Sequence, residues 1–383
     1  MQEFDFNLRT RVICGQGSLN RVGELASGFD VSRALIVTDP GIIAAGHVER
    51  AIQSLTAAGI EAYCFDGAHE NPTTEDIDRG LKFANVCEPE LLIGLGGGSS
   101  MDCAKGINFV FTNGGTMHDY QGVGKASQPM LPMIAVPTTA GTGSEMQSFA
   151  LISDSQTHVK MACGDKKASC RIAILDPELT LTQPELVTAL TGIDAVSHAV
   201  ETFVTKRRNP VSTMYSLEAW RLLASNFKAV LKDPGNLEAR SGMQLGAAYA
   251  GVAIENSMLG ASHALANPLT ASYGTAHGQA VGLMLPHVVR YNGMHCNAWY
   301  QELLGTTETL HGLPASSEGA EGLAQFLTEL IEAAGLSVNL DQCGVEAAQM
   351  PELAAAAAVQ WTGTFNPRDV DQESLLEIYQ RAF

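Results

Sequence analysis

The sequence has few basic residues for its length. Its 383 residues include 23 lysines and arginines against 41 aspartates and glutamates, so the formal net charge is −18. Nucleic acids and anionic membranes are bound through positively charged surfaces, and this balance argues against both as partners. We therefore expect a soluble protein that acts on a small molecule.

Long hydrophobic runs are also absent. No stretch reaches the roughly 18 apolar residues of a membrane-spanning helix, and the N-terminal MQEFDFNLRTR lacks the apolar core of a signal peptide. The eight cysteines are scattered, with no C-x-x-C pair, and several stand in apolar segments such as AYCF and VICG. Reduced, buried thiols in a cytoplasmic protein are the expected state.

The first half of the chain alternates two kinds of segment. Short apolar runs, typical of strands buried on both faces, cover residues 33–39, 61–67, 91–97, 133–139 and 171–177. Amphipathic stretches with helical spacing, such as TTEDIDRGLKFANV, separate them. Strand–helix–strand alternation predicts an α/β domain built on a parallel sheet.

The second half has a different character. After Thr182 the strand signals almost vanish, and alanine, leucine and methionine dominate at helical spacing. Two domains are expected from length alone, because a single core rarely grows beyond roughly 250–300 residues. We expect an α/β domain over residues 1–182 and an all-α domain over residues 183–383.

A glycine-rich loop, GGGSSMDCAKG at 96–106, directly follows the apolar run ELLIGL. Glycine lets the backbone approach a ligand closely, and a strand, a glycine loop and a helix N-terminus together form an anion site, typically for pyrophosphate. We expect Ser99 to cap the following helix, paired with Asp102 three residues later. A tight turn without a ligand is the alternative, since the loop is neither G-x-G-x-x-G nor a Walker A sequence.

A second loop, PTTAGTGSE at 137–145, follows the apolar run MIAV and again combines glycines with hydroxyl side chains. Two such loops at the carboxyl ends of neighbouring strands fit a dinucleotide in the crevice of the sheet. Asp39, at the end of ALIVTD, is placed to bind a ribose 2′-hydroxyl, and its charge would repel a 2′-phosphate. These features favour NAD over NADP. The alternative for Asp39 is a turn residue before Pro40.

The all-α half holds three histidines and one aspartate in apolar surroundings. Asp194 and His198 in GIDAVSHAVE are four residues apart, so a helix carries them on one face. Alone, they are better explained as a hydrogen-bonded pair within a helix. His263, near the end of a helix that Asn267–Pro268 should stop, and His277, at the start of the next helix, extend the set. One aspartate and three histidines suit Fe(II) or Zn(II).

Four segments, in this order, resemble the iron-containing (group III) alcohol dehydrogenase family: GGGSSMDCAK, PTTAGTGSE, GIDAVSHAVE and HALANPLTASYGTAHGQAVGLMLPH. The resemblance runs through nearly the whole chain, to NPRDVDQESLLEIYQRAF at its end. It implies a Rossmann-like α/β domain followed by an all-helical domain, an architecture that dehydroquinate synthase resembles. It also implies NAD-linked conversion of a small alcohol or aldehyde, and a homodimer or larger assembly.

The resemblance assigns functional residues position by position. The metal ligands that it implies are Asp194, His198, His263 and His277. The cofactor contacts that it implies are Asp39, Asn71, Gly97, Gly98, Ser99, Thr138, Thr139, Thr142 and Lys160, with Leu179 near the adenine.

One position, Asn267, departs from the family pattern. Many members have a histidine there, often proposed to relay a proton or to shape the substrate site, followed by proline, leucine and glycine; this chain reads Asn267–Pro268–Leu269–Thr270. Asparagine forms hydrogen bonds but does not titrate. We therefore expect intact metal binding, Asn267 as a substrate-site residue, and a proton that leaves through water or the ribose hydroxyls.

Two other functions fit parts of the sequence. A dehydroquinate synthase-like lyase would also use NAD and a metal, but its phosphorylated substrate needs lysines and arginines, which the ligand-bearing segments almost lack. A non-catalytic NAD- or metal-binding protein is the other alternative, and the complete ligand set argues against it.

Overall fold

The computed structural model describes residues 3–157, 159–311 and 318–383. The chain divides into two compact units. An α/β unit comprises Asn7–Thr139 and Gly143–Gln183, and a helical unit comprises Met1–Phe6, Ala140–Thr142 and Pro184–Phe383. Two short segments, Met1–Phe6 and Ala140–Thr142, thus belong to the helical unit although they lie in the range expected for the α/β domain.

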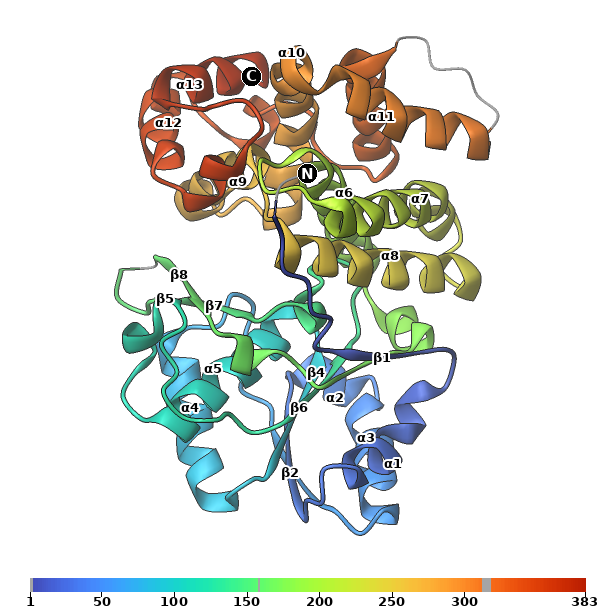
Figure 1. Ribbon diagram of the computed structural model, residues 1–383, viewed down its shortest axis with the longest axis vertical. Coiled ribbons are helices and arrows are strands. Elements are labelled where there is room, and N and C mark those ends of the chain that lie inside the picture. The colour runs from blue at the N-terminus through green and yellow to red at the C-terminus, as the bar shows by residue number, and fades with distance from the viewer. Residues whose placement is uncertain (1–2, 158, 312–317) are drawn as a thin grey trace. The chain divides into compact units, whose positions relative to one another are not determined.

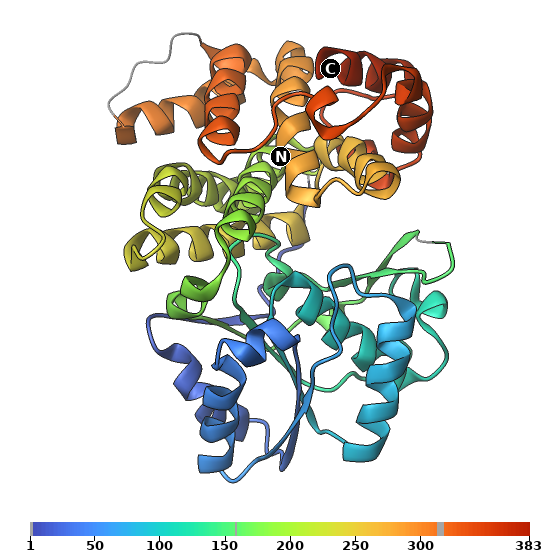
Figure 2. The ribbon, with the colours of Figure 1, turned by 180° about the vertical axis from the view of Figure 1, so that it is seen from behind.

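The α/β unit is built on a six-stranded sheet in the order β1-β9-β6-β4-β2-β3 (Figures 1 and 2). The strands are β1 (Arg11–Cys14), β2 (Arg33–Val37), β3 (Glu61–Phe65), β4 (Leu91–Gly96), β6 (Met133–Pro137) and β9 (Ile172–Leu175). Every neighbouring pair is parallel, which confirms the predicted sheet. β1 was not among the expected strands, because it lies at the edge of the sheet and is only half-buried.

Helices cover both faces of this sheet. Strand β2 shows how the two layers divide, since Leu35 and Val37 pack against one layer while Ala34 and Ile36 pack against the other. The first layer includes α4 (Thr74–Cys87) and α5 (Gly98–Asn113); the second includes α1 (Val22–Ser27) and α3 (His47–Ala57). Burial on both faces explains why the strands read as continuous apolar runs.

A small second sheet, β5-β8-β7, also belongs to this unit. It joins β5 (Gly122–Val123) in parallel to β8 (Lys160–Gly164), which pairs in antiparallel fashion with β7 (Phe149–Ser153). The sequence did not predict it, because its strands alternate between buried and exposed positions and lack a continuous apolar run.

The helical unit agrees with the all-α prediction. Its helices are α6 (Glu185–Val204), α7 (Pro210–Lys232), α8 (Leu237–Asn256), α9 (Ala261–Tyr273), α10 (His277–His311), α11 (Gly319–Ala333), α12 (Met350–Ala358) and α13 (Gln372–Arg381). Small residues allow close packing: a Cβ on Gly192 of α6 would lie 2.4 Å from the ring of Phe227 in α7. Helix α6 is the most enclosed, since nearly all of its residues after the first turn are buried.

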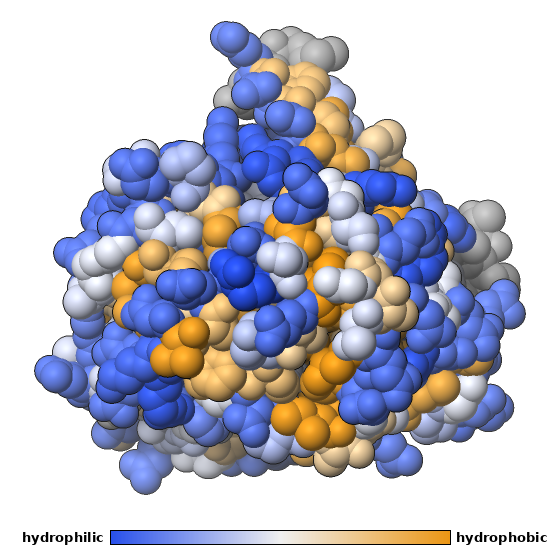
Figure 3. Space-filling model, turned by 90° about the horizontal axis from the view of Figure 1, so that it is seen from below, coloured by the Kyte–Doolittle hydropathy of each residue, from blue (hydrophilic) through white to orange (hydrophobic). Residues whose placement is uncertain are grey.

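The surface is mixed in character. Figure 3 shows one face of the molecule, where hydrophilic residues surround smaller hydrophobic areas. Within the described part of the chain, no helix is long and apolar enough to cross a membrane. None of the eight cysteines forms a disulfide, and five of them are buried while Cys14 is exposed. The expectation of unpaired thiols is thus met, and that of burial holds for most of them.

Candidate metal centre and cofactor loops

Helix α6 carries Asp194 and His198 on one face, because they are four residues apart. Both residues are buried, with 5% and 4% of their surface exposed. The neighbouring Ala195 and Ala199 are fully buried, so this part of the helix has no solvated side. A carboxylate and an imidazole in such surroundings need polar partners or a bound cation.

Two further histidines come from α9 and α10. His263 stands in the first turn of α9, and His277 is the first residue of α10. The expectation that Asn267–Pro268 stops the helix of His263 is wrong, because α9 continues through Pro268 to Tyr273, and Gly274, with a φ of 64°, is its C-cap residue. The proline costs the helix one N–H donor, and the residue is buried.

The ligand atoms converge on Oδ1 of Asp194. The Nε2 atoms of three histidines surround it, at 3.4 Å (His198), 3.5 Å (His263) and 3.8 Å (His277). Ligand atoms held tetrahedrally at about 2.1 Å from one metal ion are about 3.4 Å apart, which is close to these separations. Asp194 Oδ1 and His263 Nε2 are buried without a hydrogen-bond partner among the described residues. The ligand atoms of Asp194, His263 and His277 all lie within 4.8 Å of one another, so a metal ion fits these three donors. His198 faces Asp194 but does not belong to that compact group.

The electrostatics of the cluster favour a cation. Burial alone would raise the pKa of Asp194, but the facing histidines, His198 foremost, hold it well below its usual value. Burial alone would lower the pKa of His263, but Glu201 and Asp194 raise it to about 9. Two buried carboxylates, one facing each nitrogen of the His263 ring, thus favour positive charge between them.

Sequence reasoning missed Glu201. Its Oε2 accepts a hydrogen bond from Nδ1 of His263 at 2.6 Å, and the residue is only 4% exposed. The available signal was its spacing on α6, three residues after His198 and seven after Asp194, which places it on the same helix face.

Gly278 lets α10 approach α6 closely. A Cβ at this position would lie 2.1 Å from the backbone oxygen of Leu190, which precedes Asp194 by one helical turn. No side chain fits at that distance, so the glycine sets the separation between the helices that carry His277 and Asp194.

In the α/β unit, the first glycine loop ends at the N-terminus of α5. Gly97 is the N-cap residue, and Gly98 and Ser99 form the start of the helix. Gly96 has a φ of 151°, and a Cβ there would lie 2.3 Å from Oγ of Ser100, so only glycine fits. The first backbone N–H groups of this 16-residue helix have no side-chain cap, so the anion site that the sequence predicts remains a prediction here.

The expected cap of α5 by Ser99 and Asp102 is wrong. The helix has no side-chain cap. Instead, Oγ of Ser99 accepts a hydrogen bond from the backbone N–H of Asn71 at 3.3 Å, and Oδ1 of Asn71 accepts one from Nζ of Lys160 at 2.9 Å. The structure therefore brings together three of the residues that the family resemblance assigns to the cofactor.

The second loop is tied to α5 by buried polar groups. Asp102 accepts a hydrogen bond from Oγ of Ser144 at 2.7 Å. Lys105, fully buried, donates to the backbone oxygens of Ser144 and Phe149 at 2.7 and 2.9 Å. Burial raises the pKa of Asp102, against the effect of the lysine. Sequence reasoning assigned no role to Lys105, whose partners lie about forty residues further along the chain.

Thr138 and Thr139 lie beside the first loop. The backbone N–H of Thr138 donates to the backbone oxygen of Gly96 at 2.9 Å. A Cβ on Gly97 would lie 3.5 Å from Cγ2 of Thr139. The two glycine-containing loops are therefore neighbours at the carboxyl ends of β4 and β6, as the sequence predicted.

The remaining predicted residues have different surroundings. Oδ1 of Asp39 caps α2 (Pro40–Ala44) by accepting two backbone hydrogen bonds, while its Oδ2 lies 3.5 Å from Oγ of Ser100 at the first loop. Asp39 thus serves the turn before Pro40 and also faces the loop. Leu179 is fully buried in the core that contains α1 and α3. Thr142 lies in the short segment that belongs to the helical unit.

Glycine-containing loops at the ends of parallel strands and a candidate nitrogen–oxygen metal centre are features that a metal-assisted, nicotinamide-dependent oxidoreductase requires. Comparison with known proteins leads to the same class. Residues 9–177 match "Iron-containing alcohol dehydrogenase", and residues 188–383 match "Fe-containing alcohol dehydrogenase family, C-terminal". The chain belongs to the iron-containing alcohol dehydrogenase family, a family of NAD-linked alcohol and aldehyde oxidoreductases with an iron cofactor.

Several relatives are similar over their full length. The chain is 34% identical to a 1,3-propanediol dehydrogenase of Klebsiella pneumoniae, with 99% of both chains covered. It is 32% identical to an NAD-dependent methanol dehydrogenase of Bacillus methanolicus, with 97% of both covered. A solved structure of a 1,3-propanediol oxidoreductase matches with a TM-score of 0.94, 32% identity and 100% of both chains covered.

Proposed function

We propose that this chain interconverts a small primary alcohol or diol and its aldehyde by reversible hydride transfer with NAD. The observation that carries the proposal is the convergence of three imidazole Nε2 atoms on one buried carboxylate oxygen, 3.4–3.8 Å away. Relatives named for 1,3-propanediol and for methanol support a short alcohol as the substrate class.

We assign the metal to Asp194, His198, His263 and His277. When bound, Fe(II), or Zn(II) in its place, supplies a Lewis acid that lowers the pKa of an alcohol hydroxyl, and NAD supplies the hydride acceptor. The protein's part is to hold the ligands in fixed directions on three helices and to exclude water around them. The burial of Asp194, His198 and His263, each at most 5% exposed, supports this role.

We assign the cofactor to the two loops of the α/β unit. The N–H groups of Gly97, Gly98 and Ser99 at the start of α5 would receive the pyrophosphate, and Asp39 the ribose, which favours NAD over NADP. The other proposed contacts are Asn71, Thr138, Thr139, Thr142, Lys160 and Leu179. The hydrogen bonds that join Ser99, Asn71 and Lys160 support a shared role for these three.

Asn267 is proposed as a substrate-site residue. It follows His263 by four residues on α9, so both lie on one face of the helix. Because its amide does not titrate, the proton released with the hydride would leave through water or the ribose hydroxyls.

The test is an assay of NADH absorbance with protein purified without oxygen, Fe(II) or Zn(II), and a panel of small alcohols and aldehydes. We expect metal-dependent turnover, and we expect Asp194→Ala to abolish it. A protein that converts none of these compounds would refute the dehydrogenase proposal. Phosphate release from a phosphorylated substrate, without net NADH, would instead support the lyase alternative.

We further propose that the protein is cytoplasmic and forms a homodimer or larger assembly. The predominance of unpaired, buried cysteines is compatible with a reducing compartment. Light scattering of the purified protein measures the assembly, and a monomer at micromolar concentration would contradict that part.

A further inference from the structure

Glu201 is a buried carboxylate in an apolar part of α6. Its neighbours Val200 and Phe203 are 1% and 0% exposed, and Glu201 itself is 4% exposed. An unpaired carboxylate in such surroundings would be strongly destabilising, so its oxygens must find donors.

The donors all come from the first turn of α9. Oε2 accepts from Nδ1 of His263 at 2.6 Å, and Oε1 accepts from the backbone N–H of Ser262 at 2.7 Å. Gly260 precedes this turn. A Cβ on Gly260 would lie 3.0 Å from Oε1 of Glu201, so a larger residue would crowd the carboxylate. Glu201 therefore holds the segment that presents His263.

The bond to Nδ1 decides which nitrogen of His263 is free. A carboxylate accepts hydrogen bonds and does not donate them, so Nδ1 carries a hydrogen. In the neutral ring, which is the form that binds a metal, Nε2 then has the lone pair, and it faces Oδ1 of Asp194 at 3.5 Å.

Asn366 supports the same turn from another segment. Its Oδ1 accepts from the backbone N–H of Ala261 at 3.3 Å and from Nδ2 of Asn292 at 3.0 Å. Asn366 thus holds the backbone of the turn at Ala261, whereas Glu201 bonds the imidazole of His263 itself.

We propose that Glu201 is a positioning residue of the metal centre, which fixes the tautomer and direction of His263 and thereby strengthens binding of the divalent metal. This inference rests on the proposed ligand set. Carboxylate partners of metal-bound histidines act in this way, and their loss weakens metal binding by about 10–100-fold.

Glu201→Gln is the sharpest variant, because it keeps the shape and removes one acceptor. His263 and Ser262 donate to different oxygens of the carboxylate, and glutamine replaces one of those oxygens by an NH2 group that donates. In the variant, the NH2 group therefore faces the N–H of either His263 or Ser262, unless His263 changes tautomer. Glu185→Gln, the same substitution at an exposed position of the same helix, is the matched control.

The experiment titrates metal-free protein with Co(II) and follows the visible absorption of the bound ion against a competing chelator. We expect Glu201→Gln to bind Co(II) about 10–100-fold more weakly, with altered absorption bands, and Glu185→Gln to match the unmodified protein. If Asp194→Ala loses Co(II) binding while Glu201→Gln binds normally, the positioning role is overturned and the ligand set stands. If Asp194→Ala binds normally, the proposed metal centre fails as well.

A second measurement leaves Glu201 unchanged and so does not depend on the folding of Glu201→Gln. In Zn(II)-loaded protein with ¹⁵N-labelled histidine, NMR should show His263 with hydrogen on Nδ1 and metal on Nε2, its signals being assigned by comparison with His263→Gln. A His263 with metal on Nδ1 would overturn the inference.

Discussion

Nδ2 of Asn267 donates a hydrogen bond to Oε1 of Gln360 at 2.9 Å. The hydrogen bond joins α9, at a position one turn after His263, to Gln360, which lies two residues after the end of α12. The position where many family members have a histidine thus holds an amide pair that keeps its charge state at every working pH. Whatever carries the proton here, the amide pair does not.

Asn267→His should introduce a titrating group at this position. We expect the pH profile of kcat/KM to gain an inflection near about pH 6.5, because an unperturbed histidine titrates there. Gln360→Met, which breaks the amide pair without adding a titratable group, serves as the control and should add no inflection. An unchanged profile in Asn267→His would place the residue outside the proton route.

Gly278→Ala should weaken metal binding although it alters no proposed ligand. The added Cβ would meet the backbone of Leu190 at 2.1 Å, so α10 must shift and His277 with it. We expect about 1–3 kcal/mol of destabilisation from the overpacking and a clear loss of Co(II) affinity. Gly305→Ala, in the same helix with nothing within 4 Å of the new Cβ, is the matched control. Equal metal affinity in both variants would refute this role for Gly278.

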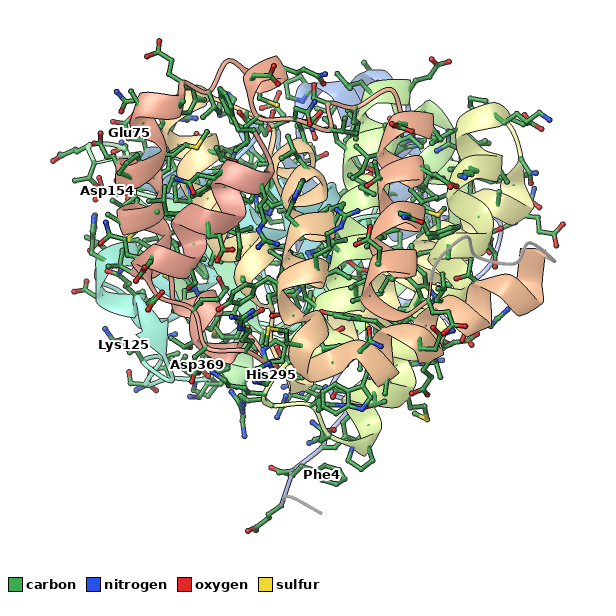
Figure 4. All side chains as sticks on the ribbon, turned by 90° about the horizontal axis from the view of Figure 1, so that it is seen from above. Phe4, Glu75, Lys125, Asp154, His295 and Asp369 are labelled. Atoms are coloured by element: carbon green, nitrogen blue, oxygen red, sulfur yellow. The ribbon has the colours of Figure 1, made fainter. Side chains whose placement is uncertain are left out.

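Metal removal should destabilise the helical unit. A ligand that binds only the folded state stabilises it by about 4 kcal/mol at a concentration 1,000 times its Kd. We expect Fe(II) to raise the melting temperature of the unmodified protein and of His295→Ala, but not of His277→Ala. His295 is a fair control because it lies exposed on the same helix (Figure 4). A full thermal shift in His277→Ala would remove it from the ligand set.

Lys105→Met should destabilise the α/β unit strongly. The variant removes a fully buried cation that donates to two backbone oxygens and lies 3.9 Å from Oδ1 of Asp102. Breaking a buried pair in this way costs about 3–5 kcal/mol, measured by urea unfolding, and we expect KM for NAD to rise because the second loop loses its support. The exposed Lys166→Met should change stability by less than about 0.5 kcal/mol.

Glu145 should give stability a dependence on pH. Burial raises its pKa from 4.5 to about 7, so the folded state keeps a proton that the unfolded chain releases. Stability contributed by this group is therefore present below pH 4.5 and falls as pH rises toward 7. We expect the free energy of unfolding of Glu145→Gln, relative to that of the unmodified protein, to rise by up to about 3 kcal/mol between pH 4.5 and 7. The exposed Glu332→Gln is the control. A difference that does not vary with pH would contradict this.

The sequence predicted the elements whose signal is local. Apolar runs without alternation correspond to the central strands, and the spacing of Asp194 and His198 places them on one helix face. Prediction failed where the decisive contact is distant. Pro268 suggested a helix end, but α9 continues through this residue, which is buried. Ser99 and Asp102 suggested a cap, but each has a partner from another segment. The role of Glu201 was not predicted because its partner, His263, lies 62 residues later in the chain.

The short segment Ala140–Thr142 has a consequence for protein engineering. It belongs to the helical unit, where a Cβ on Gly141 would lie 2.5 Å from the side chain of Thr191 on α6, yet it interrupts the α/β unit in sequence. The chain therefore passes from one unit to the other four times, after residues 6, 139, 142 and 183. A chimaera that exchanges the cofactor-binding unit between two relatives would need four matched junctions. With a single junction near residue 183, the segment at 140–142 would come from the other relative. It would then have to pack against the helix that carries Asp194 and His198.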